Sequence, residues 1–181
     1  MIQLYLLAFC RVVIALVFIL SFVGKVRNIS AFEQTIANFK FIPGRFNRFT
    51  ALMVLIGEVI VVASMVIGSQ WLWPGFLLAA LMLVIFCVAL ASVLIRRIQT
   101  SCNCFGSSKK FVSSYDILRN AGFTTCSLGG CGMLSSSHGN LVMPSWIEWG
   151  LVGMVAFIFV EVWIHLGEFV ELLHKTKLPV T

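Results

Sequence analysis

Apolar residues dominate long, almost uncharged stretches of this chain. Four of them are long enough to cross a bilayer as helices, at residues 2–23, 51–69, 73–95 and 146–167. A transmembrane helix needs about 20 predominantly apolar residues. The first stretch contains one charged residue, Arg11, and the third contains none. The pattern therefore predicts at least four transmembrane helices.

A fifth stretch, residues 117–134, carries a weaker signal. Its only charged residue is Arg119, but Gly, Ser, Thr and Cys take the place of the usual Leu and Val. Such a segment can lie at membrane depth when neighbouring helices bury it. We expect it to form a weak span or a partly re-entrant segment, which gives a bundle of four to five transmembrane helices.

The overall composition agrees with a membrane protein. The 181 residues are 60% hydrophobic and 11% charged, and the mean hydropathy is +1.01. A soluble domain carries about 25% charged residues, which are needed to cover its surface. The sequence therefore predicts an all-α integral membrane protein with a single domain over residues 1–181. The net charge is +6. We expect the basic residues to lie at one membrane face and not to form a nucleic-acid site.

The distribution of Lys and Arg predicts an orientation. With five spans, all basic residues except Arg11 fall on one side, and the other side carries the aromatic anchors Trp71, Trp73, Trp146 and Trp149. Cytoplasmic loops are enriched in Lys and Arg. We therefore expect a multi-pass protein of the cell (inner) membrane with its N-terminus outside. The first helix lacks a basic leader and a cleavage site, so we expect it to be retained.

The most specific chemical feature is the segment Ser101-Cys102-Asn103-Cys104-Phe105-Gly106, which follows the third span. Two cysteines one residue apart can pair only in a tight ring, and a strained, exposed disulfide is labile. The nearby Lys109 and Lys110 favour the thiolate, which is the attacking species. We therefore predict that Cys102 and Cys104 take part in redox or ligand chemistry, against the alternative of two unreactive loop cysteines. Because they lie on the side that is rich in Lys and Arg, we expect them on the cytoplasmic face.

A second pair, Cys126 and Cys131, lies in the weak fifth stretch. Five positions on an ideal helix place two side chains on different faces, about 7.5 Å apart along the axis. These cysteines could pair only if Gly129 and Gly130 break the helix. In that case they would form a second catalytic dithiol that exchanges electrons with Cys102 and Cys104. The alternative is that both are small residues at a close helix contact. The remaining cysteines, Cys10 and Cys87, lie alone on apolar spans and are predicted to be packing residues.

Two charges lie inside predicted spans, Arg11 in the first and Glu58 in the second. Charges in hydrocarbon are costly unless they are paired or solvated. Counted from the helix ends, the two depths differ by about one helical turn, which long side chains can bridge. We predict an Arg11–Glu58 ion pair that joins the first two spans. The functional alternative is a proton acceptor or a group that contacts a buried ligand.

These residues together resemble the methylamine utilisation protein MauE family, within the broader DoxX-like membrane proteins. The resemblance covers about residues 10–125. It rests on Cys-x-Cys-Phe-Gly at 102–106 and on a set of single positions, which are Arg11, Gly24, Lys25, Phe32, Phe39, Ile42, Pro43, Glu58, Asp116, Arg119 and Asn120. It implies a polytopic helical bundle that matures a partner protein beside a thioredoxin-like protein. The resemblance assigns the thiol function to Cys102 and Cys104. Lys25, Arg119 and Asn120 also match the family pattern, but the resemblance implies no role for them.

Three functions remain open at this stage. The leading one is a membrane thiol–disulfide oxidoreductase or maturation factor, with a quinone as a candidate electron acceptor. The second is binding or transport of a soft metal ion by cysteine thiolates. The third is a non-catalytic accessory subunit of a larger membrane complex. The sequence contains no glycine-rich phosphate loop and no Cys-x-x-Cys-His haem-attachment motif.

Overall fold

The structure is a computed structural model that describes residues 2–39, 44–96, 114–136 and 145–165. These residues form six α-helices and two short 3₁₀ turns. The elements are α1 (Ile2–Arg27), α2 (Ile29–Phe39), η1 (Gly44–Phe46), α3 (Asn47–Ile67), η2 (Ser69–Trp71), α4 (Leu72–Ile95), α5 (Ser114–Ser136) and α6 (Trp146–Ile164). The all-α fold is therefore confirmed, and each of the five predicted stretches contains a helix.

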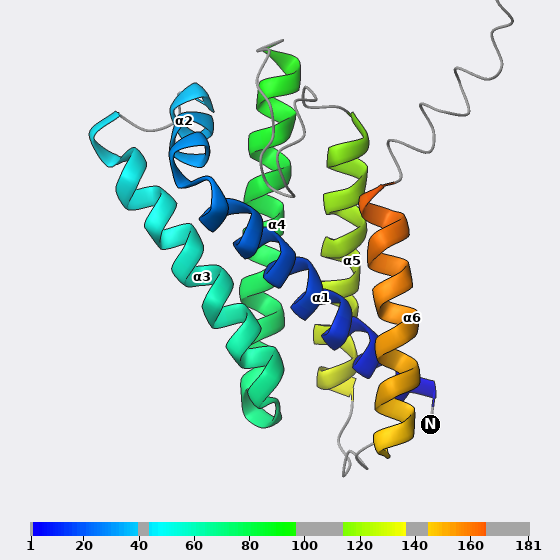
Figure 1. The fold of residues 1–181 in the computed structure, drawn as a ribbon. Helices are drawn as coiled ribbons and strands as arrows, with labels where there is room; N and C mark the ends of the chain where they lie inside the picture. The colour runs from blue at the N-terminus through cyan, green and yellow to red at the C-terminus, as the bar shows by residue number, and fades with distance from the viewer. Residues whose placement is uncertain (1, 40–43, 97–113, 137–144, 166–181) are drawn as a thin grey trace, which may run out of the picture.

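Helix α1 holds the bundle together. It runs obliquely across the bundle and packs against α3, α5 and α6 (Figure 1). Its buried face includes Cys10, Val13, Ile14, Val17 and Phe18. These positions recur every three to four residues, which is the spacing of one helix face. The short helix α2 then turns back and buries an apolar face against α3 at the end of the bundle where α1 ends.

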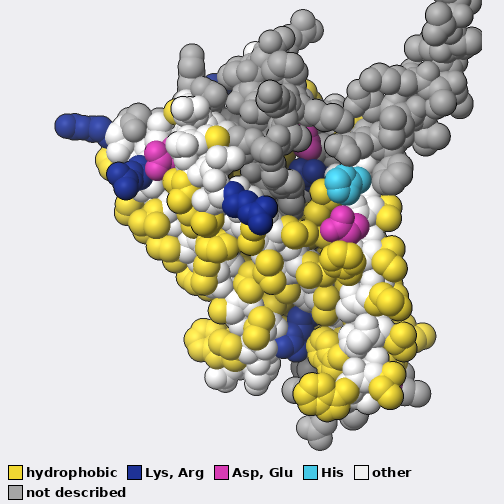
Figure 2. Space-filling model, viewed as in Figure 1, with side chains coloured by type: hydrophobic (Ala, Val, Ile, Leu, Met, Phe, Trp, Pro, Cys, Tyr) yellow, Lys and Arg dark blue, Asp and Glu magenta, His cyan; other side chains and the backbone are white. Residues whose placement is uncertain are grey.

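The outer surface of the bundle is apolar, as lipid requires. Within the described ranges, four helical segments are long and apolar enough to cross a membrane, namely α1, α3, α6 and the continuous segment Ser69–Ile95 that contains α4. On α6, Leu151, Val155 and Ile158 are each more than half exposed. Hydrophobic side chains cover most of the visible surface below the end where Lys and Arg gather (Figure 2). The protein is therefore a multi-pass membrane protein.

Helix α5 is the weak fifth stretch, and it forms one unbroken helix of 23 residues with no re-entrant turn. It makes its most extensive contact with α4. Its buried positions are Asn120, Phe123, Ser127 and Gly130, and the Ser127 hydroxyl donates to the Phe76 carbonyl at 2.7 Å. Ser127 and Gly130 thus contact Phe76 of α4, and such small or polar positions lower the hydropathy of this helix.

The two ends of the bundle differ in chemistry. Helices α1 and α4 end, and α3 and α5 begin, at the same end (Figure 1). The exposed Arg27 and Arg96 lie at these helix ends. At the opposite end, the side chains of Trp71, Trp73 and Trp146 are at least half exposed. We call these the basic end and the tryptophan end.

Glycine substitutions test the α4–α5 contact. A Cβ added at Gly130 would lie 2.6 Å from Cε1 of Phe76, whereas a Cβ at Gly129 would meet nothing within 4 Å. We expect Gly130→Ala to destabilise the protein by about 1–3 kcal/mol, the usual cost of overpacking. Gly129→Ala is the matched control and should not destabilise it. Thermal unfolding in detergent measures both, and equal midpoints for the two variants would contradict the packing described here.

Candidate functional site

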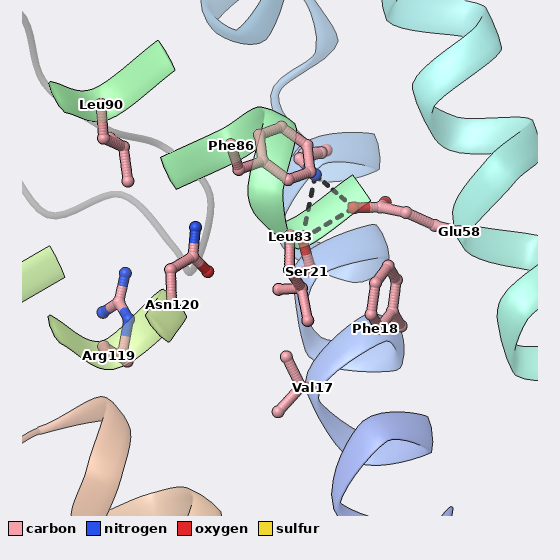
Figure 3. A pocket seen from close by; sticks show the side chains of 10 residues that line it. Val17, Phe18, Ser21, Glu58, Leu83, Phe86, Leu90, Arg119 and Asn120 are labelled. Atoms are coloured by element: carbon pink, nitrogen blue, oxygen red, sulfur yellow. Dashed lines mark hydrogen bonds and ion pairs between the residues drawn. The ribbon is translucent and has the colours of Figure 1, made fainter. Parts of the chain in front are cut away.

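A lysine and a glutamate lie fully buried near the basic end. Lys25 lies in the last turns of α1 and Glu58 near the middle of α3, and both side chains are 0% exposed. Lys25 Nζ forms an ion pair with Glu58 Oε1 and donates to Ser21 Oγ at 3.0 Å. Ser21 Oγ in turn donates to Glu58 Oε1 at 2.8 Å (Figure 3). The three side chains form a closed polar triangle between α1 and α3.

Aromatic rings cover the Lys25 ammonium from two further helices. Its Nζ lies 4.5 Å from the ring centroid of Phe86 on α4 and 5.1 Å from that of Phe32 on α2. A cation over an aromatic face is attracted by the ring quadrupole, more strongly where water is excluded. Lys25 therefore connects four helices, and Glu58 is its one carboxylate partner in the part of the chain that the structure describes.

The polar triangle forms one side of a small pocket. Arg119 and Asn120 reach the pocket from α5 on the other side (Figure 3), and its apolar walls are Val17, Phe18, Leu83, Phe86 and Leu90. The free volume is about 20 Å³, which suits a single water molecule. Glu58 Oε2 is buried and accepts no hydrogen bond from the described residues. The pocket can therefore hold one small hydrogen-bond donor against a buried carboxylate.

Arg119 connects this pocket to the surrounding helices. Its Nη2 forms an ion pair with Oδ1 of Asp116 at 3.1 Å, within the first turns of α5. Its backbone carbonyl accepts a hydrogen bond from Nε1 of Trp163 on α6 at 3.2 Å. A Cβ added at Gly122 would lie within 3 Å of the same indole ring. The position of α5 beside the pocket is therefore fixed by α6 as well as by α4.

The predicted ion pair between Arg11 and Glu58 is wrong. Arg11 Nε donates to the Met65 carbonyl at 2.5 Å and its Nη2 to the Val66 carbonyl at 3.0 Å. These carbonyls belong to the last turn of α3, where the helix leaves acceptors without an internal partner. The guanidinium also lies 5.3 Å from the Trp149 ring centroid. Counting from helix ends failed because α1 is tilted, which brings its C-terminal part to Glu58 and leaves Arg11 at the tryptophan end.

The chain turns sharply where Arg11 binds. Gly68 has a φ of 74°, a left-handed conformation that favours glycine, and its N–H donates to the Ser64 carbonyl at 3.1 Å. A Cβ at this position would also lie 2.8 Å from Nη2 of Arg11. Arg11 thus holds the end of α3 and the turn that follows it.

The structure describes one of the two predicted cysteine pairs, Cys126 and Cys131. Cys102 and Cys104 lie outside the described residues. Cys126 and Cys131 lie on the unbroken helix α5, so the helix break that their pairing needs is absent. Cys126 is half-buried and packs against the apolar core that contains Cys10 of α1. In the described part of the chain, Cys10, Cys87, Cys126 and Cys131 are all free thiols.

The pocket is lined by residues that the sequence analysis did not assign to one site. Lys25, Glu58, Arg119 and Asn120 come from three helices and line the same small space. Sequence reasoning missed the Lys25–Glu58 pair because it ended the first span at Val23 and counted Lys25 with the basic loop. The available signal was the four-residue spacing of Ser21 and Lys25, which places both on one helix face.

The fold and this pocket define a class, a multi-pass helical membrane protein with a charge pair buried between its spans. Residues 3–133 match the family described as methylamine utilisation protein MauE. The methylamine utilization protein MauE of Paracoccus denitrificans is 30% identical over 148 residues, which cover 81% of this chain and 76% of that protein. No solved structure matches the chain. This chain belongs to the MauE family.

A double-mutant cycle tests the buried ion pair. Lys25→Met leaves the Glu58 carboxylate buried without its counter-charge, and Glu58→Met does the same to the Lys25 ammonium. Each single variant should be destabilised by about 3–5 kcal/mol, whereas the double variant should recover much of that loss. The free energy of unfolding in detergent micelles is the measurement. Arg27→Met, at an exposed position of the same helix, should change it by less than about 0.5 kcal/mol. Strictly additive effects of the two single variants would rule out the pair.

A conservative substitution tests the role of Arg11. Arg11→Lys keeps the charge but loses the planar fork that binds two carbonyls at once. We expect it to destabilise the protein by about 1.5–3 kcal/mol, the value of a hydrogen bond to a charged group. Arg27→Lys is the matched control on α1 and should be neutral. If both variants unfold at the same temperature in detergent, Arg11 does not hold the end of α3.

Proposed function

We propose that this protein is a membrane-embedded maturation factor for methylamine utilisation, in which Cys102 and Cys104 exchange disulfides with a thioredoxin-like partner. The observation that carries this proposal is membership of the MauE family combined with the Cys-x-Cys sequence between α4 and α5. The name of the family supports a role in methylamine utilisation, and the cysteine pair suggests thiol–disulfide exchange as the chemistry.

The surroundings of the cysteine segment support this chemistry. The segment leaves α4 at Ile95 and enters α5 at Ser114, both at the basic end. Because α4 and α5 pack tightly along their length, its two attachment points are fixed. Arg97, Lys109 and Lys110 belong to the same segment, and neighbouring cations favour the thiolate over the thiol. Two closely spaced thiols in a segment attached to the helical bundle suit disulfide exchange with a soluble partner at the membrane surface.

The exchange itself needs no further reagent. A thiolate of one dithiol attacks the disulfide of the other through a mixed disulfide, and the second thiol then releases it. When the Cys102–Cys104 disulfide opens, its two sulfurs gain two electrons and two protons, and the partner's two thiols lose them as its disulfide closes. The reverse reaction follows the same steps.

We also infer that the basic end faces the cytoplasm in the inner membrane, with the N-terminus outside. This rests on the excess of Lys and Arg at that end. The cytoplasm keeps thiols reduced, so in this orientation the loop would receive its electrons from the inside. A membrane-impermeant maleimide, applied to sealed vesicles of each orientation, should label Cys102 and Cys104 only when the cytoplasmic face is outside.

The proposal predicts a redox change confined to two cysteines. Native membranes are quenched with acid with or without prior oxidation, free thiols are blocked, and the previously bridged cysteines are labelled after reduction. Cys102 and Cys104 should change together between the free and the bridged state. In a methylamine-using host that depends on this chain, Cys102→Ser or Cys104→Ser should abolish growth on methylamine, because one sulfur cannot close the ring. Cys87→Ala, on a span away from the loop, should leave growth unchanged.

Two outcomes would overturn the proposal. One is that Cys102 and Cys104 keep the same state under every redox condition. The other is full growth of the Cys102→Ser/Cys104→Ser double variant at normal protein abundance. The first result would leave soft-metal binding or a non-catalytic accessory role, and the second would favour the accessory role.

A further inference from the structure

One oxygen of the buried Glu58 carboxylate, Oε2, lacks a hydrogen-bond donor among the residues that the structure describes. The other oxygen, Oε1, binds Lys25 and Ser21. A buried acceptor without a donor is costly, and more so when it is charged. We propose that the pocket beside this carboxylate is a binding site for one internal water molecule, which joins Glu58 of α3 to Asn120 of α5.

The size of the pocket limits what it can hold. Its free volume is about 20 Å³, and one water molecule needs about 10–15 Å³ of such space. An organic substrate or a quinone ring is far larger than this. The ligand of the pocket is therefore a single small molecule or ion.

The charges around the pocket select a neutral ligand. Two cations line it, Lys25 and Arg119, and each has a carboxylate partner. Lys25 pairs with Glu58, and Arg119 pairs with Asp116. These four charges balance one another, so a bound ion would add an uncompensated charge among apolar walls, which is costly inside a membrane protein. A neutral molecule of this size adds no such cost.

Hydrogen-bonding groups lie on both sides of the pocket. Glu58 can only accept, because an ionised carboxylate has no proton to donate. On the other side, the buried side chain of Asn120 extends from α5 toward the polar triangle (Figure 3), and its amide can both donate and accept. A water molecule donates one hydrogen bond to Glu58 Oε2 and forms a second with the Asn120 amide. An internal water needs two to four polar partners, and this site provides them.

The water adds a polar link between helices. Helix α5 packs mainly against α4 and α1, and the water connects it to α3 as well, through the carboxylate that Lys25 and Ser21 hold in place. Helix α5 begins at Ser114, six positions before Asn120, so the link fixes the first turns of this helix relative to the charge pair. No cysteine takes part in it, and it is independent of the proposed disulfide exchange.

Water-edited solid-state NMR on the full chain in liposomes tests the site. Magnetisation is transferred from water protons to ¹³C-labelled side chains, and only carbons close to water gain signal at short mixing times. The Glu58 carboxyl carbon should gain signal several-fold faster than the methyl carbons of Val61, which is 0% exposed on the same helix and does not line the pocket. Equal rates at the two residues would mean a dry pocket and overturn the proposal. A Glu58 carboxyl shift that changes when choline replaces sodium in the buffer would indicate a bound cation and overturn it as well.

Two variants locate the water. Val17→Ile adds a methylene group to a wall of the pocket, and Asn120→Leu removes the amide on its far side. Both should lose most of the fast signal gain at Glu58, while the dipolar coupling between Lys25 Nζ and the Glu58 carboxyl carbon shows that the ion pair is intact. Val23→Ile, at an exposed position of α1, is the matched control and should keep the fast gain. If both pocket variants keep the coupling and the fast gain, the water lies elsewhere and the proposal is wrong. The wild-type comparison does not depend on the folding of either variant.

Discussion

A lysine ammonium and a glutamate carboxylate lie against each other in the interior of this bundle, and both side chains are 0% exposed. At membrane depth a lone charge is costly, so each of these groups depends on the other. The Lys25–Glu58 pair joins the end of α1 to the middle of α3, and Ser21 forms hydrogen bonds with both side chains. Removing either partner would leave an uncompensated charge among apolar side chains, which is far worse than replacing both.

The same requirement explains the remaining polar side chains of the bundle. Arg11 binds the carbonyls that α3 leaves open at its end, and Ser127 donates to a carbonyl of α4. Helix α5 is too polar to face lipid on all sides, yet its Ser and Gly positions match the surface of α4. The helices around the pocket at the basic end are therefore fixed in position by contacts with several neighbouring helices. Any exchange of thiols in the adjoining loop would take place on a rigid support.

Much of the fold follows from the sequence, because lipid allows few alternatives. Long apolar stretches must be helical, since a bilayer offers no partners for backbone groups, and helices form over all five predicted ranges. The contacts between side chains of different helices could not be predicted in this way. The apolar pattern predicted that the first span ends at Val23, whereas α1 continues to Arg27 and brings Lys25 into the bundle. The tilt of α1, which decides that Lys25 and not Arg11 meets Glu58, comes from packing between helices and has no local signature. The two cysteines of the loop lie outside the described residues.

The account depends most on the buried charge pair, and its geometry can be measured in a bilayer. Solid-state NMR on protein labelled with ¹⁵N at lysine and arginine side chains and ¹³C at glutamate can report the dipolar coupling to the Glu58 carboxyl carbon. The assignment uses Glu58→Gln. We predict a strong coupling to Lys25 Nζ, consistent with an N···O separation below about 4 Å. A Glu58 carboxyl that couples to an Arg11 nitrogen, or to no side-chain nitrogen, would contradict the arrangement of α1 and α3 described here.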